Sequence, residues 1–155
     1  MIIAAIRPDS WNLPLLIHVA GAMLLVGVLV TVAALLLAGR RGDGAPLTRL
    51  GFRVLLFAGI PSYLLMRVGA ELVAAEEDVV NTAADDSAWI GIGYITSDLG
   101  LLLIIITTVL AGVGSRRLAR ADGGGGGATS AAAWLTVLVL VAYVIAIWAM
   151  TAKPA

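Results

Sequence analysis

Four long apolar blocks, separated by short polar segments, dominate the pattern along the chain. They cover residues 13–38, 50–74, 89–114 and 131–151. A helix needs roughly 20 apolar residues to cross the hydrocarbon core of a bilayer, and each block is long enough. Lipid offers the backbone no hydrogen-bond partners, so such blocks have to be helical. The pattern predicts an all-α polytopic membrane protein, a four-helix antiparallel transmembrane bundle forming a single domain over residues 1–155.

The polar segments between the blocks differ in charge. Loop one (39–49) and loop three (115–130) each hold three arginines and one aspartate, whereas loop two (75–88) holds five acidic residues and no basic one. Short loops rich in Lys and Arg stay in the cytoplasm. We therefore expect loop two and both termini outside, an N-out/C-out orientation. Tryptophans favour the membrane interfaces, and they fall at these predicted boundaries: Trp11, Trp89 and Trp148 at the outer one and Trp134 near the inner one.

Composition restricts the function class. Apolar residues make up 61% of the chain and the mean hydropathy is +1.03, against about 45–50% apolar residues in a soluble domain. The chain has no cysteine, which excludes disulfides and thiolate metal sites. Its formal net charge of zero argues against a nucleic-acid partner. The expected partner is the lipid bilayer.

A few ionisable residues interrupt the apolar blocks, and such residues usually have a partner or a function. At about 1.5 Å per residue, His18, Arg67 and Asp98 lie about 8, 10 and 13 Å below the outer ends of their helices. Glu71 lies at about 4–5 Å, and Tyr94 and Tyr143 at about 8–12 Å, by the same arithmetic. These side chains are therefore predicted to share one layer in the outer half of the membrane.

Helical phase sharpens this cluster. Tyr63, Arg67 and Glu71 recur at i, i+4 and i+8, and Tyr94 and Asp98 at i, i+4. If both stripes face inward, Arg67 and Asp98 form an ion pair with the other polar residues as neighbours. In the alternative, Arg67 extends toward the outer surface and pairs only with Glu71. The cluster would relay protons or hold a small polar solute, or it would be a structural clasp between two helices.

Three glycine-containing segments carry further predictions. Gly21 and Gly27 are expected to let neighbouring helices approach closely. Gly59 and Pro61 mark an expected kink and hinge, because Pro61 cannot donate a hydrogen bond to the carbonyl of Phe57. The run 123–127 is expected to be a flexible tether.

His18 has alternative interpretations. It could be an axial ligand of haem b, with Met23, Met66, Met150 or a second protomer supplying the other ligand. A metal site of His18 with Asp98 and Glu71 is a further alternative, although their spacing is not diagnostic. A histidine that relays protons or donates a hydrogen bond is the simpler interpretation, and no cofactor is predicted.

The segment Leu16-Ile17-His18-Val19-Ala20-Gly21-Ala22, followed by Val26-Gly27, resembles the opening helix of small bacterial integral membrane proteins. The segment from Trp89-Ile90-Gly91 to Asp98-Leu99-Gly100 is similar to the same group. The first segment is also distantly similar to CopD-like copper-resistance and b-type cytochrome-like bundles, whose His-x-x-Gly helix implies a metal or haem ligand at His18. This resemblance implies a multi-pass protein of the bacterial cytoplasmic (inner) membrane.

No catalytic motif is present, so we expect a protein that is not an enzyme. The leading hypothesis is an accessory subunit or a proton or small-solute carrier that uses the polar cluster. The alternatives are a haem-bearing or quinone-linked redox subunit that uses His18, and a structural or assembly protein. A homo-oligomer or a larger membrane complex fits each of them.

Overall fold

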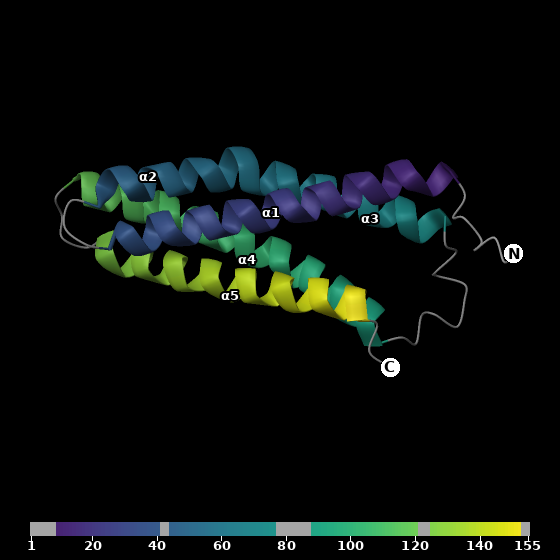
Figure 1. Ribbon diagram of the computed structural model, residues 1–155. Helices are drawn as coiled ribbons and strands as arrows, with labels where there is room; N and C mark the ends of the chain where they lie inside the picture. The colour runs from purple at the N-terminus through teal and green to yellow at the C-terminus, as the bar shows by residue number, and fades with distance from the viewer. Residues whose placement is uncertain (1–8, 41–43, 77–87, 121–124, 153–155) are drawn as a thin grey trace, which may run out of the picture.

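The computed structural model describes residues 9–40, 44–76, 88–120 and 125–152, which form an antiparallel bundle of long helices without a strand (Figure 1). Four helical spans are long and apolar enough to cross a membrane. The chain is therefore a multi-pass membrane protein with the predicted all-α four-helix fold. The acidic part of loop two, residues 77–87, lies outside the described residues.

The second span is built from three helical segments, and a 3-10 turn precedes the first span. In chain order the elements are η1 (Asp9–Trp11), α1 (Asn12–Ala38), α2 (Ala45–Val54), the π-helix η2 (Leu55–Gly59), α3 (Ile60–Glu76), α4 (Ala88–Ala119) and α5 (Gly125–Ala152). The N- and C-termini lie at one end of the bundle (Figure 1). We call this end the outer end and the opposite end the inner end, following the predicted orientation.

Three boundaries differ from the sequence prediction by five residues or more. The second span begins at Ala45 rather than at residue 50, and the third ends at Ala119 rather than at residue 114. Gly125–Gly127 form the first turn of α5, so the prediction of a tether is wrong for these residues; Gly123 and Gly124 lie outside the described residues. The first N–H groups of a helix have no intrahelical acceptor. The start of α5 also packs closely against α4, because a Cβ atom on Gly114 would lie 2.6 Å from the hydroxyl oxygen of Thr129.

The second span changes its packing partner along its length. Its inner part, α2, packs against α4 and α1, whereas its outer part, α3, packs against α1 and hardly touches α4. The π-helix lies between these two parts, and its wider turn ends where the Ile60 N–H donates to the Leu55 carbonyl. Pro61 follows directly, and its ring would clash with the Phe57 carbonyl in a regular α-helix. The predicted hinge residues Gly59 and Pro61 thus lie at this change of partner; their movement stays a prediction.

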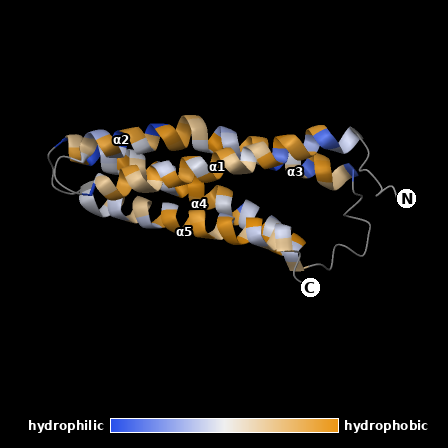
Figure 2. Cartoon of the chain, in the orientation of Figure 1, coloured by the Kyte–Doolittle hydropathy of each residue, from blue (hydrophilic) through white to orange (hydrophobic). Residues whose placement is uncertain are grey.

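The buried core follows one face of α1. Leu25, Leu29, Val32 and Leu36 are almost completely buried against the other helices. Apolar residues also cover the outside of the bundle, and Figure 2 shows them along all the long helices, with hydrophilic residues toward the two ends. Helices that are apolar all round are typical of a bilayer environment.

Glycines set the spacing of α1 and α3. A Cβ atom on Gly21 would overlap the backbone of Met66, and one on Gly69 would overlap the backbone of His18. Each glycine therefore lets the opposite helix approach to backbone contact. Gly27 has open space beside it, so the prediction that it is a packing glycine is wrong.

The substitution Gly21→Ala should lower the free energy of unfolding by about 2 kcal/mol, because the added Cβ forces α1 and α3 apart. Gly27→Ala is the matched control, since its Cβ meets no other atom. Unfolding in mixed micelles with increasing dodecyl sulfate, followed by circular dichroism, measures both. Equal stability of the two variants would contradict this account of the α1–α3 contact.

Candidate functional site

A cleft of about 480 Å³ opens in the outer half of the bundle, between the pair α1 and α3 and the pair α4 and α5. All four helices line it, and its walls are mostly apolar. Figure 1 shows the two pairs diverging toward the outer end. The cleft exists because α3 leaves α4 beyond the π-helix, so no helix closes this side of the bundle.

Four residues of the predicted polar cluster line this cleft. They come from four different helices: His18 from α1, Arg67 from α3, Tyr94 from α4 and Tyr143 from α5. Residues of one predicted layer thus meet in one cavity.

Arg67 is the centre of the charged contacts. Its Nη1 lies 3.3 Å from Asp98 Oδ1 on α4, and its Nη2 lies 2.9 Å from Glu71 Oε1 one turn along α3. The guanidinium carbon also lies 5.2 Å from the centroid of the Tyr94 ring, within reach of a cation–π contact. The predicted Arg67–Asp98 ion pair is confirmed, and the alternative in which Arg67 pairs only with Glu71 is wrong.

The expectation that both polar stripes face inward is wrong in part. The side chains of Arg67, Glu71 and Asp98 are 26%, 52% and 65% exposed in the isolated chain. Glu71 and Asp98 are not among the residues that line the cleft. Since α3 and α4 hardly touch here, Arg67 extends across the open seam and joins the two helix pairs.

His18 is oriented by a backbone contact. Its Nδ1 lies 3.0 Å from the Met66 carbonyl oxygen. A carbonyl can only accept, so Nδ1 carries the proton and donates it. In the neutral ring Nε2 then keeps its lone pair, which can accept a hydrogen bond or ligate a metal.

The tyrosines have different surroundings. The Tyr63 hydroxyl lies 3.4 Å from Ser97 Oγ in a buried contact between α3 and α4. The Tyr143 hydroxyl is buried, and it has no hydrogen-bond partner among the described residues. An unsatisfied buried hydroxyl is costly, and this one belongs to a side chain that lines the cleft. It is a candidate contact for a bound molecule.

Several cleft residues were not predicted from the sequence. They are small apolar residues that leave room for the cavity, among them Ala70, Gly93 and Ala146. Such residues are common in any membrane helix, so their types alone carry no signal of a cleft. One pattern in the sequence does fit the structure. Each of α1 and α3 has a glycine three residues after a cleft residue, Gly21 after His18 and Gly69 after Met66, and in the antiparallel pair each glycine faces the cleft residue of the other helix.

The alternative metal site is not assembled. Among the residues that the structure describes, no group of three or more His, Cys, Asp or Glu side chains could hold a metal ion. His18 lines the cleft, while Glu71 and Asp98 do not line it and contact Arg67 instead. The three metal ligands considered from the sequence therefore do not come together, because Arg67 contacts the two carboxylates.

Comparisons of the chain with protein-family models, curated proteins and solved structures find no match. The resemblance to small bacterial membrane proteins and to CopD-like bundles therefore stays a prediction.

Arg67→Gln and Asp98→Asn should each lower stability, because the first leaves Asp98 without its partner and the second leaves Arg67 with Glu71 alone. The double variant should be at least as stable as the less stable of the two single variants, which corresponds to a coupling energy of about 1 kcal/mol. Unfolding of the four proteins in mixed micelles measures this coupling. Glu76→Gln combined with Asp98→Asn is the control pair and should be additive; coupling of equal size there would rule out a specific contact.

Proposed function

We propose that this protein binds a small amphipathic solute in its outer cleft, as a carrier or as an accessory subunit of a larger membrane complex. The observation that carries the proposal is the cleft itself, a cavity of about 480 Å³ with mostly apolar walls and a few converging polar side chains. Binding sites for small molecules commonly have this composition. We place the protein in a bacterial inner membrane, with both termini outside.

The charges beside the cleft favour a neutral or cationic head group. Arg67 carries one positive charge, and its two partners Glu71 and Asp98 carry two negative charges when ionised. Taken together, these three side chains carry one excess negative charge beside the cleft. The Tyr94 and Tyr143 rings in the cleft wall add aromatic surface, which attracts cations.

A solute fits this arrangement better than a proton. Between the cleft and the inner-end arginines, the described helices carry no Asp, Glu, His or Lys. The threonines of this region donate to carbonyls of their own helices, as Thr107, Thr108 and Thr136 do. A chain of titratable side chains across the membrane is therefore missing from the described residues. Movement of the helix pairs about Gly59 and Pro61 would be needed to carry a solute further.

The charge preference can be measured with two probes of nearly the same shape. Tetraphenylphosphonium is a lipophilic cation, and tetraphenylborate is a lipophilic anion. We expect the protein in nanodiscs to bind the cation roughly tenfold more tightly, as one excess charge at close range suggests. Equilibrium dialysis measures this after subtraction of binding to empty nanodiscs. Equal binding of both probes would contradict the assigned charge preference.

The cleft is tested in the same assay by Ala70→Phe, which fills the cavity from α3. Ala75→Phe is the matched control, because Ala75 is exposed on the same helix and does not line the cleft. Cation binding should be lost in the first variant and kept in the second. Loss in both variants or in neither would exclude the cleft as the binding site.

A haem-bearing or quinone-linked subunit is the second candidate, and one observation favours it. The cleft is lined by His18 together with Met23, Met66 and Met150, the methionines that could supply a second axial ligand. Nδ1 of His18 donates to a carbonyl, the contact that usually orients a metal-binding histidine.

If haem b is bound, protein purified from cells supplied with a haem precursor should show a Soret band. The band should vanish in His18→Ala, because the iron loses its ligand, and it should persist in Ala75→Phe. A colourless preparation would exclude the haem candidate and leave the solute-binding proposal untouched.

A further inference from the structure

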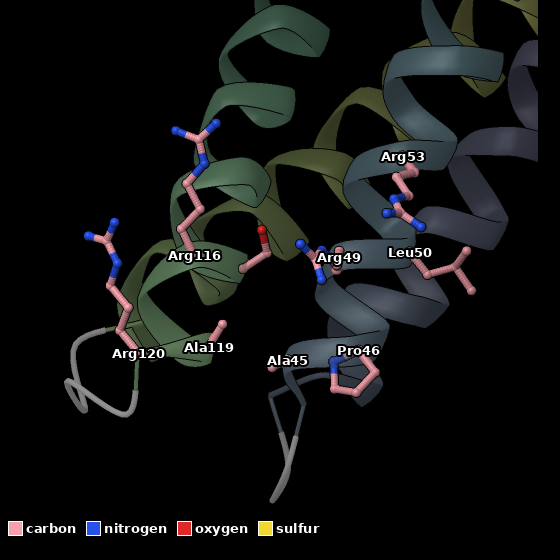
Figure 3. Close-up of a pocket in the computed structure, with 9 residues that line it drawn as sticks. Ala45, Pro46, Arg49, Leu50, Arg53, Arg116, Ala119 and Arg120 are labelled. Carbon is pink, nitrogen blue, oxygen red and sulfur yellow. The ribbon is translucent and has the colours of Figure 1, made fainter.

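A second cavity, of about 590 Å³, lies between α2 and α4 at the inner end of the bundle (Figure 3). Four arginines line it, Arg49 and Arg53 from α2 and Arg116 and Arg120 from the end of α4. The other lining residues are small, apolar or hydroxylic, and none is acidic. We call this cavity the arginine groove.

The four arginines lack counter-charges within the described chain. None of them forms an ion pair with a described residue, in contrast to Arg67, which forms two. In Figure 3 the Arg49 side chain lies toward α4, while those of Arg116 and Arg120 extend away from α2. An anion in the groove would attract these positively charged side chains, which are long enough to turn toward it.

The depth of the groove matches the head-group layer of the membrane. The spans that form it, Ala45–Glu76 and Ala88–Ala119, have 32 residues each. At 1.5 Å per residue they are about 48 Å long, against about 30 Å of hydrocarbon and about 40–45 Å with both head-group layers. If the bundle is centred in the bilayer, their inner ends extend beyond the hydrocarbon into the head-group layer. Leu50, exposed in the same groove, provides an apolar surface for an acyl chain.

We propose that the arginine groove binds the phosphate of an anionic phospholipid from the inner leaflet. Guanidinium groups bind phosphate oxygens in pairs of parallel hydrogen bonds. Basic pockets between transmembrane helices on the cytoplasmic side are suited to acidic head groups. The lipid would connect α2 to α4 at the end of the bundle where these two helices pack together. This site is independent of the outer cleft and of the solute proposed there.

The test titrates phosphatidylglycerol into the full-length protein in detergent and follows lipid-bound states by native mass spectrometry. Arg53→Gln/Arg116→Gln removes one arginine from each wall of the groove and should weaken binding roughly tenfold. The control Arg40→Gln/Arg117→Gln removes the same charge from the same end, but neither residue lines the groove. The affinity of this control for phosphatidylglycerol should stay within about threefold of the wild-type value. Equal loss in both variants would overturn the proposal, because general surface charge would then explain the binding.

Two further ligands identify the source of the phosphate. Phosphatidylcholine, which has no net charge, should bind at least tenfold more weakly than phosphatidylglycerol if head-group charge decides the affinity. Inorganic phosphate at low millimolar concentration should not displace the lipid, because it lacks the acyl chains. Equal affinity for the two lipids, or displacement by inorganic phosphate, would overturn the assignment to an anionic lipid.

Discussion

The interrupted second span is the constraint on which the rest of this bundle depends. Pro61 has no N–H group for the Phe57 carbonyl, and the turn before it widens into a π-helix from Leu55 to Gly59. The inner part of the span packs against both α4 and α1, whereas its outer part packs against α1 and hardly touches α4. The outer cleft opens where this contact with α4 is lost.

The two ends of the bundle handle charge in opposite ways. At the outer end, Arg67 contacts two carboxylates and so partly neutralises charges that would be costly at membrane depth. At the inner end, four arginines share one groove and have no described acidic partner. The outer site is therefore nearly self-sufficient and leaves room for a neutral or cationic molecule. For the inner site we therefore propose an anionic lipid as the partner of the arginines.

Much of this arrangement could be predicted from the sequence, and the reasons differ by residue. The Arg67–Asp98 pair followed from helical phase and depth, since few opposite charges were available at that level. The exposed position of Asp98 did not follow, because it depends on α3 and α4 being separated. Gly21 and Gly27 looked alike in sequence, yet only Gly21 faces another backbone. The face that a membrane helix presents is hard to predict when all its faces are apolar.

The sequence by itself determined the number of spans, their helical state and the uneven distribution of charge between the two ends. These follow from the cost of placing polar groups in hydrocarbon, which acts on each segment separately. Only the tertiary structure decided which helices touch, where the cleft opens and which of the polar residues line it. Those outcomes depend on whether a single Cβ atom fits between two helices, as at the contacts of Gly21 with Met66 and of Gly69 with His18, which join residues 45 and 51 positions apart.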